Sequence, residues 1–60
     1  MDELHFKVGD RVCKISGDYR FAGVVVAAFH KISGRARYVV ENDDGLLHVF
    51  SAPNLIKAND

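Results

Sequence analysis

Few side chains in this sequence have types and spacing suited to catalysis or metal binding. Cys13 is the only cysteine, and the histidines, His5, His30 and His48, are scattered along the chain. A thiolate metal site needs several cysteines, and no Cys/His set here has the spacing of a zinc site. We therefore expect no metal ligands, and we interpret Cys13 as a small, apolar residue of a strand.

The acidic residues do not indicate a catalytic pair either. Asp43 and Asp44 are adjacent, but they lie in the run from Asn42 to Gly45, which has the composition of a hairpin turn. No glycine-rich phosphate loop and no serine nucleophile elbow is present. These residues taken alone predict no enzymatic chemistry.

The elements that must position these side chains are short strands. Apolar or alternating runs predict strands at residues 11–15, 21–29, 35–41, 46–50 and 55–57. Glycine-containing clusters predict the turns between them. Pro53 cannot donate to a strand ladder, so residues 51–54 are expected to form a 3-10 turn. Together these elements predict a closed or nearly closed all-β barrel.

Side-chain alternation predicts which residues face the core. Ala36, Tyr38 and Val40 share one face of their strand. The run at residues 21–29 is too apolar for a strand that is wetted on one face. We expect it to be buried on both faces, either inside the fold or against another subunit.

Composition limits the class of protein. The 60 residues are 48% hydrophobic and carry no net charge. So small a domain buries a limited core, and with one cysteine its most plausible further support is oligomerisation. No apolar run is long enough to span a membrane, the N-terminus is not typical of a signal peptide, and we expect a cytoplasmic protein. Balanced charge makes nucleic acid an unlikely partner, although Lys31, Arg35 and Arg37 form a local basic patch.

The order of features resembles the type II, plasmid-borne, trimethoprim-insensitive dihydrofolate reductases. The resemblance covers residues 6–56 and depends most on GDRVCKISG (Gly9 to Gly17), with Phe21 at the position of an interface tryptophan, and on LHVF (47–50). It implies a small five-stranded SH3-like barrel at residues 6–57, with a 3-10 turn before the last strand. Residues 1–5 would then be a flexible lead-in and residues 58–60 a frayed tail.

The resemblance also implies a function. Members of that family are homotetramers in which NADPH reduces dihydrofolate in one central pore. Their Val-Gln-Ile-Tyr strand corresponds to Leu47, His48, Val49 and Phe50, and their pore lysine corresponds to Lys14. This implies that His48, Val49 and Phe50 are catalytic, that Lys14, Leu47, His48 and Val49 bind cofactor, and that Lys14, His48 and Phe50 bind substrate.

Two of these positions depart from the family pattern. His48 replaces glutamine, and a neutral imidazole still offers one donor and one acceptor. Phe50 keeps the aromatic ring of the family tyrosine but lacks its hydroxyl. Two alternatives to the reductase remain open, namely a module that binds peptide or nucleic acid through the basic patch, and a structural oligomer without a ligand.

Overall fold

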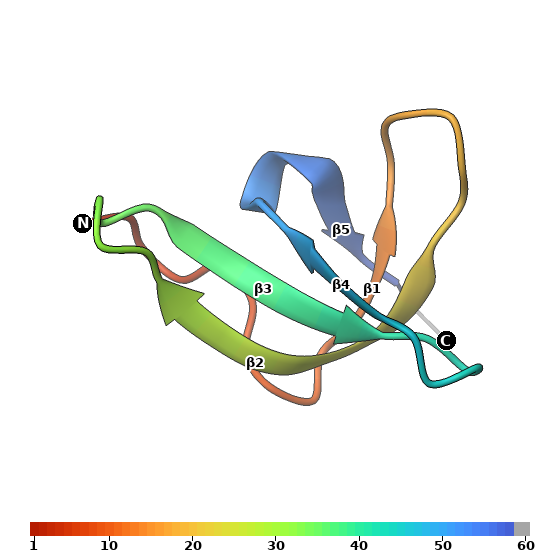
Figure 1. Cartoon of the computed structure of the whole chain (residues 1–60). Coiled ribbons are helices and arrows are strands. Elements are labelled where there is room, and N and C mark those ends of the chain that lie inside the picture. Colours follow the sequence, from red (N-terminus) through yellow and green to blue (C-terminus); the bar gives the residue numbers. More distant parts are fainter. Residues whose placement is uncertain (59–60) are drawn as a thin grey trace.

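A computed structural model describes residues 1–58 and shows a single antiparallel sheet of five strands (Figure 1). The elements in chain order are β1 (Arg11–Lys14), β2 (Ala22–His30), β3 (Ala36–Glu41), β4 (Leu47–Phe50), the 3-10 turn η1 (Ala52–Asn54) and β5 (Leu55–Lys57). The predicted all-β fold, with five strands and a 3-10 turn before the last, is confirmed. Each predicted strand boundary lies within one residue of the observed one.

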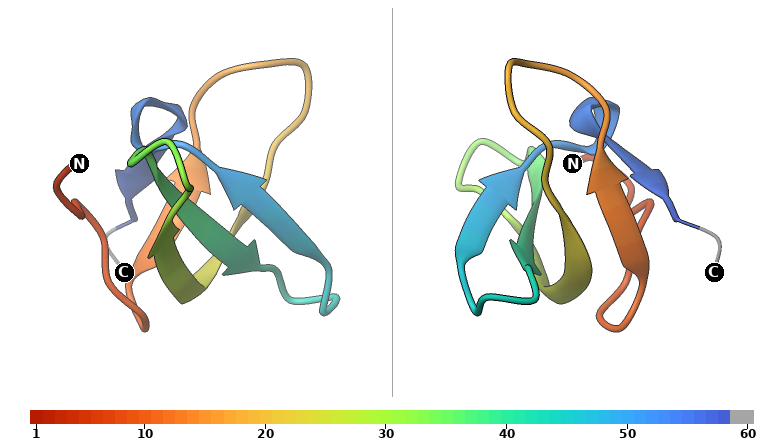
Figure 2. Two further views of the ribbon diagram at one scale, coloured as in Figure 1. Left: turned by 60° about the vertical axis from the view of Figure 1, so that its left-hand side comes forward. Right: turned by 90° about the vertical axis from the view of Figure 1, so that its right-hand side faces the viewer.

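The sheet is curled into the shape of a small barrel. Its strand order is β4-β3-β2-β1-β5, so β4 and β5 are the two edges and no ladder joins them. Figure 2 shows β4 and β5 on the two sides of the curl, with the long β1–β2 loop projecting beyond the strands. No helix in residues 1–58 is long and apolar enough to cross a membrane. The predicted tail, residues 58–60, lies mostly outside the described part of the chain.

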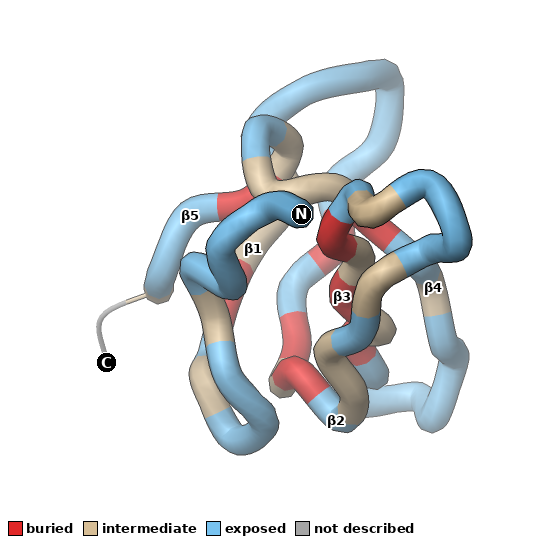
Figure 3. The backbone as a smooth tube through the Cα atoms, turned by 90° about the vertical axis from the view of Figure 1, so that its left-hand side faces the viewer, coloured by how far each residue is buried: buried red, intermediate tan, exposed pale blue. Residues whose placement is uncertain are grey.

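The core lies inside the curl, and Figure 3 marks the backbone positions of its buried residues in red. The predicted inward face of β3 is confirmed, because Ala36, Tyr38 and Val40 are all buried. Burying one valine or larger side chain contributes about 1.5–3 kcal/mol, which makes this cluster the main source of stability. The buried cluster comprises Val12, Phe21, Val25, Ala36, Tyr38, Val40, Phe50 and Leu55.

Gly23 marks the closest approach between two strands. A Cβ at this position would overlap with the carbonyl group of Glu41 in β3. That contact is with backbone, which has no rotamer by which to move away, so only glycine lets β2 lie so close to the end of β3.

β2 contains a bulge, after which the side chains that would have pointed inward point outward. Val25 pairs with Val40 and Ala27 pairs with Val39, so Val26 is an extra, bulged residue. After the bulge Phe29 faces outward, and Val26 and Phe29 are 40% and 42% exposed. Of the two expected ways to bury this run, burial inside the fold does not hold for the single chain, because the bulge turns part of the run to the outer face. Burial of that part against another subunit stays a prediction.

The N-terminal residues lie along the β2–β3 hairpin. The backbone N–H of Asp2 donates to the carbonyl of Gly34, and the Asp2 carboxylate accepts from the N–H of Ala36 at 3.1 Å. The N–H of His5 donates to the hydroxyl of the buried Tyr38 at 2.9 Å. The bond from His5 satisfies the one polar atom that the Tyr38 side chain brings into the core.

Candidate functional site

Most of the residues predicted for the site meet where the β1–β2 loop touches β4. Tyr19 and Phe21 come from this loop, and His48 and Phe50 come from β4. We call these four side chains the aromatic cluster. Lys14, at the end of β1, lies against Tyr19. The fold therefore brings Lys14, His48 and Phe50 into one contiguous group, although 33 residues separate Lys14 from His48 in the sequence.

His48 is held by ring contacts on two sides. Its imidazole stacks on Phe21, with ring centroids 4.3 Å apart and an interplanar angle of 18°. Tyr19 packs edge-on against it at 5.7 Å, and the Tyr19 hydroxyl lies 3.2 Å from His48 Nδ1. The imidazole is thereby oriented, with Nδ1 occupied by Tyr19 and Nε2 left as the remaining polar atom.

Lys14 organises the loop that carries Tyr19. Its ammonium group donates to the backbone carbonyls of Ser16 and Tyr19, and it lies 4.0 Å from the centroid of the Tyr19 ring. Such a cation–π contact adds to the two hydrogen bonds. Gly17 permits this arrangement, because it has a φ of +93° and a Cβ there would overlap with the Lys14 ammonium. Lys14 thus holds Tyr19 against His48.

The four residues of β4 point in alternate directions. Phe50 is 6% exposed and its ring belongs to the core, so in a single chain it supports the site from beneath. Leu47 and Val49 face outward and are 59% and 58% exposed. The exposure of His48 is intermediate, between that of the buried Phe50 and that of the exposed Leu47 and Val49.

The hydrogen-bond register of β3 and β4 directs the backbone of two residues away from the sheet. The N–H of Asn42 donates to the carbonyl of Leu46, which fixes the hydrogen-bonded set of pairs. Pairs alternate in an antiparallel ladder, so His48 and Phe50 exchange hydrogen bonds with β3. The N–H and C=O of Leu47 and Val49 therefore point out from the open edge.

Tyr19 is not among the site residues predicted from the sequence. The fold places its hydroxyl on His48 and its ring under Lys14. An aromatic residue beside a glycine turn and a lysine was the available clue. Within residues 1–58, no three His, Cys, Asp or Glu side chains are grouped closely enough to hold a metal ion.

Comparison with known proteins adds no assignment. No protein-family model matches the sequence, and no curated protein matches it significantly. The geometry of the aromatic cluster and of the open edge of β4 is therefore the evidence that bears on function.

Proposed function

We propose that this chain is the subunit of a homotetrameric, NADPH-dependent dihydrofolate reductase of the type II kind, insensitive to trimethoprim. The observation that carries the proposal is the outward-facing amide of Val49 on the open edge of β4. One residue there offers an N–H donor and a C=O acceptor side by side. A carboxamide and the amide edge of a pterin present the complementary pair of groups.

Outward apolar side chains support the assembly of several copies. Ala27, Val39 and Val49 form one row across β2, β3 and β4, and Leu47 extends the exposed apolar surface along β4. A soluble monomer rarely leaves such surface open next to an unpaired strand edge. In a symmetric assembly each β4 strand would recur around one axis, so one amide per subunit would face the shared pore.

The residues present fit the nicotinamide end of NADPH better than its phosphates. Val49 supplies the paired donor and acceptor, and Tyr19 presents an exposed aromatic ring. Lys14 is engaged inside its loop, so it contributes positive charge near the site while its donors are directed to Ser16 and Tyr19. Arg20 follows Tyr19 in the same loop and is exposed.

In the proposed reaction the protein orients the two reactants and supplies no acid–base group. NADPH, when bound, supplies the hydride that reduces dihydrofolate, and the accompanying proton comes from water. Val49 would fix the plane of a bound amide, and His48 Nε2 would donate to or accept from a ligand or a symmetry-related His48. Holding the two reactants close together in the reactive orientation can supply a large part of an enzyme's rate enhancement.

The test is NADPH oxidation by the purified chain with dihydrofolate, in excess trimethoprim. The oligomeric state of the protein is measured at the same concentration. We expect a rate that His48→Ala lowers at least tenfold. The matched control is His5→Gln, because His5 is exposed and its hydrogen bond to Tyr38 is made by the backbone N–H, which glutamine keeps. A tetramer that neither binds nor oxidises NADPH would contradict the proposal.

A further inference from the structure

Basic and acidic residues are segregated along this chain. The net charge is zero, with eight residues of each sign, but residues 19–40 contain four of the basic residues and no Asp or Glu. Those four are Arg20, Lys31, Arg35 and Arg37. The local field, rather than the net charge, decides where a polyanion binds.

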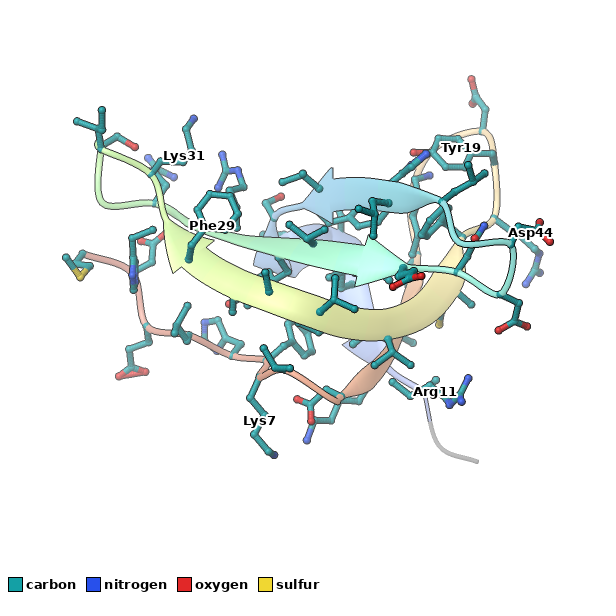
Figure 4. The ribbon with its side chains drawn as sticks, turned by 60° about the horizontal axis from the view of Figure 1, so that its bottom comes forward. Lys7, Arg11, Tyr19, Phe29, Lys31 and Asp44 are labelled. Atoms are coloured by element: carbon teal, nitrogen blue, oxygen red, sulfur yellow. The ribbon has the colours of Figure 1, made fainter. Side chains whose placement is uncertain are left out.

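The bulge in β2 places the basic residues of the hairpin beside an aromatic ring. Phe29 pairs with Arg37, and the N–H of Lys31 donates to the carbonyl of Arg35, so the same register continues to the turn. Because every second pair shares a face, these four side chains lie on the outer face of the hairpin end. We call Phe29, Lys31, Arg35 and Arg37 the basic hairpin face. Figure 4 shows Phe29 and Lys31 together there, with Lys7 on the opposite side of the sheet.

These cations have no acidic partner in the part of the chain that the structure describes. Among residues 1–58 Lys31, Arg35 and Arg37 form no ion pair, and Arg37 donates only to a neighbouring carbonyl. The acidic segment of Asp2 and Glu3 lies close to Arg35 and Arg37, but the Asp2 carboxylate accepts from the backbone N–H of Ala36 at 3.1 Å rather than from either guanidinium group. Arg35 and Arg37 also line a cavity of about 810 Å³, with that segment among its other walls.

We propose that the basic hairpin face binds single-stranded nucleic acid. Phe29 is 42% exposed, which leaves one ring available for a base to stack on. Arg37 lies opposite Phe29 on β3, and Lys31 and Arg35 follow two pairs further toward the turn, at the spacing that lets them reach the phosphates next to a stacked base. A duplex keeps its base faces covered, and the Asp and Glu side chains of an acidic peptide offer no aromatic ring to stack on Phe29.

The test is fluorescence anisotropy of a labelled oligothymidine with the whole chain, in a salt titration. Three phosphate contacts predict a slope of log K against log salt of about −2. The double variant Arg35→Gln, Arg37→Gln is expected to weaken binding at least tenfold and to reduce the slope to about −0.7. Phe29→Ala is expected to weaken binding about tenfold without changing the slope, whereas Phe29→Tyr should retain binding.

Lys7→Gln is the matched control, because it removes one exposed positive charge from the opposite side of the sheet. It should leave the affinity unchanged. Equal affinity for duplex DNA, heparin and oligothymidine, with no effect of Phe29→Ala, would overturn the proposal and leave charge as the only attraction. Binding to anionic lipid vesicles without binding to oligothymidine would overturn it in favour of a lipid surface, and no binding at low salt would overturn it outright.

Discussion

His48 owes its orientation to neighbours that are remote in sequence. Phe21 supports one face of the imidazole, and Tyr19 closes over its edge with a hydroxyl on Nδ1. Lys14 holds Tyr19 in place through the loop backbone and the ring. His48, the side chain proposed to contact the ligand, is therefore positioned by residues that need not contact the ligand themselves.

The Tyr19→Phe variant tests this arrangement, because it removes the hydroxyl and keeps the ring. We expect the free energy of unfolding to fall by about 0.5 kcal/mol, the lower end for a net hydrogen bond, since the site is exposed. Tyr38→Phe is the matched comparison: it leaves the N–H of His5 without its partner beside the core and should cost about 1 kcal/mol or more. Urea unfolding measures both, and a larger loss for Tyr19→Phe would contradict this account.

The two edge strands of the sheet differ in how they are protected. The outward backbone groups of β5 belong to Leu55 and Lys57, and the Lys57 side chain lies 3.7 Å from Asp10. A charged lysine on an edge discourages pairing with another chain. β4 has no Lys, Arg, Asp or Glu from Leu47 to Phe50. The edge proposed to face a pore is therefore the one without a charged side chain that would discourage pairing with another chain.

The alternation along β4 predicts a specific pattern in solution. On addition of NADP⁺, the amide resonances of Leu47 and Val49 should shift, whereas those of His48 and Phe50, which are bonded to β3, should move much less. A nitrogen-15 correlation spectrum of the chain measures all four together. Adenosine 2′,5′-bisphosphate, which lacks nicotinamide, is the control and should leave the amide resonance of Val49 unshifted. Uniform shifts along β4 would contradict the proposed role of the edge.

At the scale of the whole molecule, Asp10 connects the segment before β1 to the edge strand β5. Its carboxylate accepts from the N–H of Lys7 at 3.0 Å and lies near the ammonium groups of Lys57 and Lys7. The Lys7 N–H is the largest cause that lowers the pKa of Asp10 below its usual value of 3.8; the two ammonium groups lower it further, and partial desolvation opposes them.

A lowered pKa makes the contribution of Asp10 depend on pH in one direction. The stabilisation is fully present above the unfolded-state pKa and is lost as pH falls through the lower folded-state pKa. Asp10→Asn should therefore lower the melting temperature at neutral pH and flatten its decline below about pH 4. Thermal unfolding between pH 7 and pH 2 measures this. Asp44→Asn, on an exposed hairpin tip, is the control and should change little, and an unchanged acid limb in Asp10→Asn would contradict the assignment.

The sequence by itself determined the number, order and approximate limits of the strands. β-branched runs, glycine turns and Pro53 act locally, so their effects can be predicted without knowing the fold. The inward face of β3 was predictable for the same reason, because strict alternation leaves one choice. Lys14 and the LHVF strand were identified through a family resemblance, which the geometry leaves as a proposal.

Only the tertiary structure decided which way several key groups point. Nothing local in three consecutive valines marks Val26 as the bulge, yet that residue turns Phe29 outward and places it among Lys31, Arg35 and Arg37. The burial of Phe50, the contact of Tyr19 with His48 and the outward amide of Val49 likewise depend on which strands become neighbours. Pairing register and strand order are long-range properties, because a shift of one residue reverses every side chain on a strand.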